Sequence, residues 1–246
     1  MRCPGQDMRF WRPGDIFQIP CPKCGTTVEF FKDEVRRKCR CGHEIVNPKL
    51  DLGCAEWCPY AEQCIGAVPE EVKAKQRTER ETSLRERIAL EMKIYFGKDM
   101  KRVNHAVKVA RYAEQILKME GGDPLVILGA AYLHDIGALE AQKKCEAARV
   151  DYFACQEAEG VPIAREILKR LAVKEEATEE ICDIIGHHHH PREEESLNFQ
   201  IVYESDGLVN IEEGGISQDR EKVLAIIDES FRTEAGRQIA KRLFML

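Results

Sequence analysis

The sequence lacks any apolar run long enough to span a membrane, and its N-terminus lacks the hydrophobic region of a signal peptide. Both absences argue against a membrane protein or a secreted protein. We therefore expect a cytoplasmic protein with no membrane partner. An excess of positive charge is also missing, because the formal net charge is −6 at pH 7. This balance argues against general binding to nucleic acids or to membrane surfaces.

What the sequence does contain is enough apolar material for a sizeable core. Hydrophobic residues make up 43% of its 246 residues and charged residues 33%, a composition that suits one large domain or a domain with a small module. Of the 11 cysteines, most fall in the first quarter of the chain. Clustered thiols in a reducing compartment are more often metal ligands than disulfides. We therefore expect a metal-binding module at the N-terminal end.

The first cysteine group consists of two close pairs, with a short predicted strand at residues 27–31 between them. Four thiolates in two pairs form a tetrahedral site of the kind that zinc prefers, and the pattern resembles a zinc ribbon. The expected zinc ligands are Cys21, Cys24, Cys39 and Cys41. Two alternatives stay open, since His43 is near enough to replace one cysteine and the thiols could also be unligated.

A second cysteine group follows, with Cys54, Cys58 and Cys64. Three thiolates are one short of a closed site, and Cys3 could fold back to complete it. Such a site would hold zinc or an iron–sulfur cluster, and ordinary half-buried thiols are the alternative. A module of this size has almost no core, so its metals would supply much of its folding energy.

The charge pattern divides the chain into three parts. Residues 1–68 form the cysteine-rich module, residues 69–83 a highly charged linker helix, and residues 84–246 a helical domain. Ser83 is predicted to begin a new helix as its N-cap, because Glu86 follows three residues later.

The most informative stretch is the apolar run that begins at Leu125 and contains the adjacent pair His134-Asp135. Asp is rarely buried without a partner, because removing a lone carboxylate from water costs several kcal/mol or more. A metal ion would compensate the charge, and we expect a helix to carry the pair. A simple His–Asp hydrogen bond inside a helix core is the alternative reading.

Three other places in the chain favour a metal. His105 lies on the apolar stripe of a predicted helix at residues 104–119, and Asp206 lies on a stripe that includes Val202 and Val209. A run of four histidines, residues 187–190, ends a predicted helix and stops at a proline; we expect one or two of them to reach the site. Taken singly, His105 could be a core histidine and Asp206 an exposed carboxylate.

His105, His134-Asp135 and Asp206, in this order on separate helices, resemble the H…HD…D signature of the HD-domain phosphohydrolases over about residues 84–240. The resemblance implies an all-α helical bundle in which these four residues bind a divalent metal. It also implies that His187 and His188 act on a second metal or on a phosphate. Where several members have a further histidine, this chain offers Gln156 or Glu157, which argues against a dinuclear site.

The donor chemistry agrees with this resemblance. Two imidazoles and two carboxylates leave open positions on an octahedral ion, which favours Mn, Fe, Co, Ni or Mg over tetrahedral zinc. Such an ion lowers the pKa of bound water and clamps a phosphoryl oxygen, while a nearby histidine steadies the phosphate or protonates the leaving oxygen. We therefore expect a metal-dependent phosphohydrolase acting on a nucleotide or another phosphate ester.

Two other functions fit the same residues. One is an HD-type diiron oxygenase. The other is a non-catalytic nucleotide-binding sensor or adaptor, which would dock a protein or nucleic acid through its zinc module.

Overall fold

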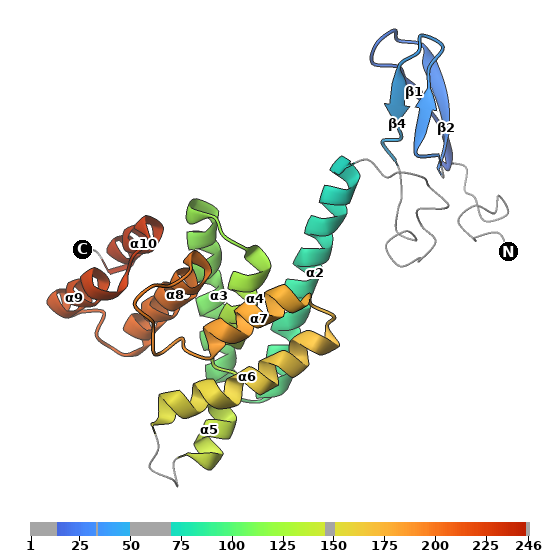
Figure 1. The fold of residues 1–246 in the computed structure, drawn as a ribbon. Helices are drawn as coiled ribbons and strands as arrows, with labels where there is room; N and C mark the ends of the chain where they lie inside the picture. Colours follow the sequence, from blue (N-terminus) through green and yellow to red (C-terminus); the bar gives the residue numbers. More distant parts are fainter. Residues whose placement is uncertain (1–13, 33, 50–69, 146–150, 245–246) are drawn as a thin grey trace. The chain divides into compact units, whose positions relative to one another are not determined.

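The computed structural model describes residues 14–32, 34–49, 70–145 and 151–244 (Figure 1). The chain divides into two compact units, residues 1–79 and residues 80–246.

The N-terminal unit contains two small antiparallel hairpins. Strand β1 (Ile16–Pro20) pairs with β2 (Thr27–Phe31), and β3 (Arg36–Lys38) pairs with β4 (Glu44–Val46). The strand expected at residues 27–31 is therefore confirmed. Each hairpin carries one cysteine pair in a turn that closes on a glycine with positive φ, Gly25 at 72° and Gly42 at 85°. The expectation of a small β module carrying four cysteines is confirmed.

The long helix α2 (Glu70–Phe96) passes through Ser83 without a break. The prediction of a helix start at Ser83 was wrong. On the C-terminal part of α2, Leu84, Ile88, Met92 and Phe96 recur every four residues and are buried in the helical core. The charged segment and the first core-packing segment are therefore one helix.

The helical domain continues with eight further helices in its described residues and confirms the expected all-α bundle. They are α3 (Met100–Glu120), α4 (Pro124–Leu133), α5 (Ala138–Lys144), α6 (Tyr152–Arg170), α7 (Glu175–Ile185), α8 (Leu197–Glu213), α9 (Arg220–Ser230) and α10 (Glu234–Phe244). Helix α3 packs against α4, α8 and α10. The C-terminal segment breaks between α9 and α10, and Gly236 lies inside α10.

Helix α4 is the centre of the bundle. Eight of its 10 residues are buried, and it contacts α3, α7 and α8. The expectation that no apolar run reaches membrane-spanning length was wrong, because among the described residues the stretch Pro124–Lys144 is long and apolar enough. However, 72% of its most apolar window is buried inside the domain. A helix that is apolar on all sides and covered by its neighbours is a core helix.

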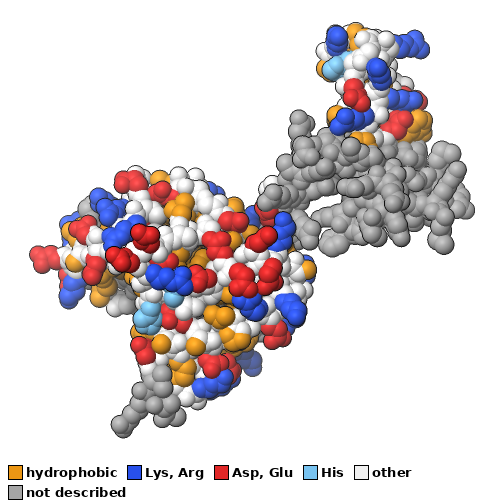
Figure 2. Space-filling model, viewed as in Figure 1, with side chains coloured by type: hydrophobic (Ala, Val, Ile, Leu, Met, Phe, Trp, Pro, Cys, Tyr) orange, Lys and Arg blue, Asp and Glu red, His pale blue; other side chains and the backbone are white. Residues whose placement is uncertain are grey.

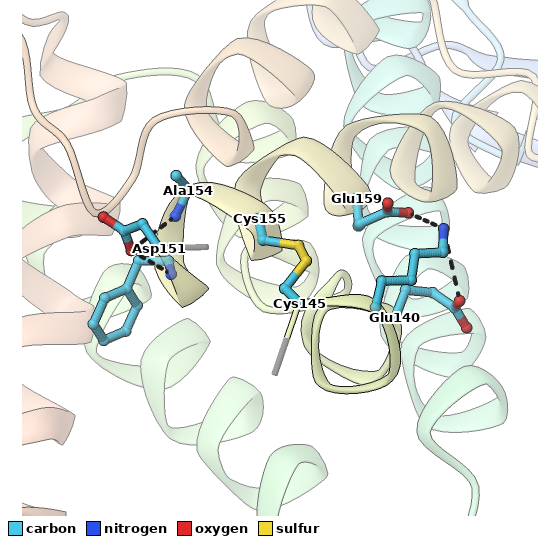
Figure 3. The surroundings of a disulfide bond; sticks show 8 residues. Glu140, Cys145, Asp151, Ala154, Cys155 and Glu159 are labelled. Carbon is cyan, nitrogen blue, oxygen red and sulfur yellow. Dashed lines mark hydrogen bonds and ion pairs between the residues drawn. A yellow bond between two sulfur atoms is a disulfide. The ribbon is translucent and has the colours of Figure 1, made fainter. Parts of the chain in front are cut away.

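A disulfide joins α5 to the start of α6 (Figure 3). Cys145 directly follows α5 and Cys155 lies in the first turn of α6, with their Cα atoms 6.5 Å apart. Asp151 caps α6, and Lys144 pairs with Glu159 across the same junction at 2.6 Å. Nothing in the sequence pattern pairs these two cysteines. The bond fixes the first turn of α6 beside α5.

The turn that follows α4 also lies against α6, and here the two main chains are in contact. A Cβ atom on Gly137 would lie well within 3.0 Å of the carbonyl oxygen of Gln156 and of the amide nitrogen of Gly160. Only glycine fits at this position, and the contact brings α6 directly beside His134 and Asp135.

Candidate metal centre

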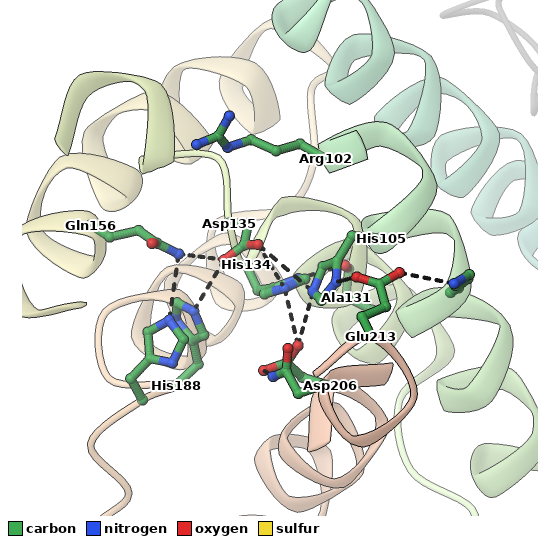
Figure 4. A network of polar contacts seen from close by, with 12 residues as sticks. Arg102, His105, Ala131, His134, Asp135, Gln156, His188, Asp206 and Glu213 are labelled. Atoms are coloured by element: carbon green, nitrogen blue, oxygen red, sulfur yellow. Dashed lines mark hydrogen bonds and ion pairs between the residues drawn. The ribbon is translucent and has the colours of Figure 1, made fainter. Parts of the chain in front are cut away.

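Four side chains from three parts of the bundle converge on one point (Figure 4). Nε2 of His105, on α3, lies 3.0 Å from Oδ1 of Asp206, on α8, and 3.7 Å from Oδ2 of Asp135. Nε2 of His134 lies 3.5 Å from Asp135 Oδ2 and 3.6 Å from Asp206 Oδ1. Because α3 packs against both α4 and α8, the bundle itself brings these residues together. The four residues singled out by the sequence therefore form one cluster.

The His134-Asp135 pair sits just beyond the end of α4 and not within the helix as expected. Helix α4 ends at Leu133, and a tight turn follows in which the amide of Ala138 donates to the carbonyl of Asp135. The last carbonyls of a helix have no partner in its own ladder. Nδ1 of His134 uses one of them, the carbonyl of Ala131 at 2.9 Å. Nδ1 therefore carries the proton, and the lone pair of Nε2 points into the cluster.

His188 repeats this arrangement at the end of α7. Its Nδ1 donates to the carbonyl of Ile185 at 2.8 Å, and its Nε2 lies 3.8 Å from Oδ1 of Asp135. Among the described residues, Nε2 of His134 and Nε2 of His188 are two of three buried side-chain polar atoms without a hydrogen-bond partner. An imidazole whose Nδ1 is anchored by a carbonyl and whose Nε2 is bare is the usual form of a metal-binding histidine.

The charges at the centre also suit a cation. Burial raises the pKa values of Asp135 and Asp206, but the surrounding imidazoles outweigh it and hold both pKa values below the ordinary range. Burial lowers the pKa of His134, which keeps that ring neutral. Two ionised carboxylates and a neutral imidazole thus face one another in a space largely closed to solvent. This donor set fits a divalent metal ion.

The model of the HD domain family matches residues 102–230 of this sequence, which is more than half of the chain. The chain belongs to the HD domain family. All four clustered residues lie within the matched span, so the resemblance inferred from the sequence is confirmed.

A solved structure is similar to the chain as well. It is the crystal structure of a predicted HD superfamily hydrolase from an uncultured Thermotogales bacterium, which is 23% identical, with a TM-score of 0.49. The similarity covers 64% of this chain and 83% of that one. None of the curated proteins matches the sequence.

The cluster of His105, His134, Asp135 and Asp206 is called the HD centre below. Two rings of the four-histidine loop point toward it. Ligand atoms of Asp135, His188 and His189 lie within 4.8 Å of one another. His187 points elsewhere: its Nε2 lies 3.0 Å from Glu195 and its ring stacks on Phe199. The structure therefore brings His188, but not His187, to the centre, and adds His189. Consecutive residues in a turn have no periodicity, so the sequence held no signal for this choice.

Gln156, and not Glu157, faces the HD centre from α6. The amide nitrogen of Gln156 donates to Oδ1 of Asp135 and lies 3.4 Å from Nε2 of His189. Glu157 turns toward the histidine loop instead, where its carboxylate accepts the backbone N–H of His189 at 2.7 Å and contacts Nδ1 of His190 at 2.8 Å.

A cavity of about 530 Å³ opens over the HD centre. Its rim carries two cations, Lys101 and Arg102, and two aromatic residues, Tyr152 and Phe153. Histidine side chains reach the surface of the domain (Figure 2). A larger cavity of about 670 Å³ lies between residues 191–203 and 229–233, but it contains none of the four clustered residues. The cavity over the HD centre is therefore the candidate substrate site.

The first cysteine group forms a second, separate cluster in the N-terminal unit. Sγ of Cys21 lies 3.8 Å from Sγ of Cys41, and Sγ of Cys24 lies 3.6 Å from Sγ of Cys39. Zinc–sulfur bonds of about 2.3 Å in a tetrahedron separate the sulfurs by roughly 3.8 Å, so the four thiols fit zinc without His43.

Cys3, Cys54, Cys58 and Cys64 lie outside the described residues. The second cysteine site therefore stays a prediction.

Proposed function

We propose that this HD-domain protein is a metal-dependent phosphohydrolase acting on a nucleotide or another phosphate ester. One observation carries the proposal: two almost fully buried histidines have bare Nε2 atoms beside ionised carboxylates, His134 beside Asp135 and Asp206 and His188 beside Asp135. A buried polar atom without a partner is costly, and a bound cation would remove that cost.

His105, His134, Asp135 and Asp206 would hold the ion. Their mixed nitrogen and oxygen donors suit Mn, Fe, Co, Ni or Mg with positions left open. When bound, such an ion lowers the pKa of a water molecule and neutralises charge on phosphoryl oxygens.

The residues around the cavity supply the rest of the chemistry. Arg102 is held in place by Asp99, and with Lys101 it offers positive charge to a phosphate group. Burial lowers the pKa of His188, but Asp135 outweighs it and the pKa is raised, so a cation that approaches this ring competes with a proton. Burial and His188 lower the pKa of His189 to about 4, which keeps that ring neutral.

Gln156 supports this proposal over a diiron oxygenase. Its amide donates a hydrogen bond to Asp135 at the place where a second cation would need another electron-pair donor. The sensor or adaptor function would differ from the proposed one by ligand binding without turnover.

The test is a screen of nucleotides and other phosphate esters with Mn, Co, Ni or Mg added to the purified chain. We expect metal-dependent release of phosphate. Asp206→Asn keeps the shape of the side chain but removes its charge, so metal affinity and hydrolysis should fall together by more than about 100-fold. Loss of a residue that only supports a metal ligand typically costs 10- to 100-fold, so a larger fall identifies Asp206 as a ligand.

The matched control is Asp183→Asn, which removes a carboxylate paired with Arg192 at the surface and should leave both quantities unchanged. Full hydrolysis by Asp206→Asn, or no turnover under any metal, would overturn the proposal.

A further inference from the structure

Glu213 is the last residue of α8, seven residues after Asp206, and its carboxylate reaches back to α3. Oε2 lies 3.0 Å from Nδ1 of His105, and Oε1 accepts a hydrogen bond from Nζ of Lys108 at 2.9 Å. Figure 4 shows Glu213 on the opposite side of the His105 ring from Asp135. The carboxylate therefore bridges two residues of α3 and touches the ring nitrogen that faces away from the HD centre.

The three inward histidines differ in what can anchor their Nδ1 atoms. His134 and His188 follow the ends of α4 and α7, where the last carbonyls are free to accept, and each ring uses one. His105 lies in the second turn of α3, a helix that continues to Glu120. The carbonyls beside it accept hydrogen bonds within the helix. Its ring therefore needs an acceptor from another element.

We propose that Glu213 is a positioning residue that orients His105 for the metal ion. The proposal rests on the metal centre of the proposed function. Glu213 holds the proton on Nδ1, so that Nε2, beside Asp135 and Asp206, is the nitrogen that gives up its proton to a metal ion. A carboxylate on the distal nitrogen also makes the ligand more basic, and loss of such a partner typically costs 10- to 100-fold in metal affinity.

Lys108 keeps Glu213 in this role. Its ammonium group binds the second oxygen of the carboxylate, so Glu213 has one oxygen for His105 and one for Lys108. The pair therefore acts through His105 and does not add a ligand to the centre.

The neighbouring Glu212 provides a matched control. Its carboxylate accepts a hydrogen bond from the hydroxyl of Tyr112, also on α3. Glu212→Gln therefore removes the same charge from the same turn of α8 while the contact with His105 remains.

The experiment is a Mn²⁺ titration of the chelator-treated full chain, with free Mn²⁺ followed by electron paramagnetic resonance. Glu213→Leu removes the acceptor and should weaken binding 10- to 100-fold. Glu213→Gln keeps a neutral acceptor and should give an intermediate loss. Glu212→Gln should stay within about twofold of the wild type. In the metal-free chain, ¹⁵N spectra should show Nδ1 of His105 protonated in the wild type and no longer protonated in Glu213→Leu. A merely structural role of Glu213 would leave this protonation unchanged.

Wild-type Mn²⁺ affinity in Glu213→Leu, or an equal loss in Glu212→Gln, would overturn the positioning role while the proposed hydrolysis stands. Mn²⁺ binding by the wild type without any hydrolysis would overturn the proposed function alone. A wild-type chain that binds no divalent ion would overturn both.

Discussion

Addition of a divalent ion to the metal-free chain should release a proton from His105. Burial lowers the pKa of this ring, but Asp206, Asp135 and Glu213 outweigh burial and raise the pKa to about 9. At pH 7 both ring nitrogens are therefore protonated, whereas a metal ligand needs a bare Nε2. The proton competes with the metal over about two pH units, from 7 to 9. The apparent affinity should rise about tenfold per unit well below the pKa and less steeply near it, hence roughly 50-fold over this range.

Isothermal titration with Mn²⁺ between pH 6.5 and 8.5 measures this effect. Runs in two buffers of different ionisation enthalpy should report release of about one proton at pH 7. The pKa of His188 is also raised, so displacement of its proton would make the slope steeper. An affinity that does not change with pH, with no proton released, would refute the reasoning about His105.

The same shift predicts how the metal-free chain responds to pH. The pKa of His105 is about 9 in the folded state and about 6.5 when unfolded, so its contribution to stability is full below pH 6.5 and is lost as pH rises through 9. The difference of about 2.5 units corresponds to about 3 kcal/mol in the free energy of unfolding. Urea unfolding at pH 6.5 and 9.5 measures it, and an unchanged stability would contradict the assignment.

The remaining predictions concern other parts of the chain. Cys24→Ser should release zinc and unfold the N-terminal unit, whose described residues bury an apolar cluster of four, while the helical domain melts as before. Unchanged zinc content by elemental analysis would exclude the assignment. Gly137→Ala should cost about 1–3 kcal/mol of stability in urea because its Cβ meets main chain, whereas Gly207→Ala, with its nearest neighbour at 3.4 Å, is the tolerated control. Replacing both Cys145 and Cys155 with Ser should cost about 3 kcal/mol under oxidising conditions and little with a reductant present; equal losses in both would mean that packing, not the bond, is responsible.

The sequence was a good guide where periodicity or residue chemistry decides the structure. The H…HD…D residues and the four cysteines were identifiable because their donor chemistry is unusual in a core or at a surface. It was a poor guide at Ser83, where the serine and Glu86 form a capping pattern. The residues on both sides are good helix formers, so the helix continues through the serine.

Contacts between distant segments were beyond any local pattern. The pairing of His105 with Glu213 spans 108 residues of sequence, and two consecutive glutamates at 212 and 213 give no hint of which one turns toward the histidine. The choice of His189 over His187 depends in the same way on the direction of a turn.

The contact of Gly137 with α6 has a consequence for redesign. Main-chain atoms, not side chains, set how closely α6 approaches the turn that follows α4. The backbone of residue 156 is therefore already in place, and the side chain at this position decides which atom α6 offers to Asp135. One substitution at residue 156 would therefore exchange the group that contacts Asp135 while the backbone of the bundle stays unchanged.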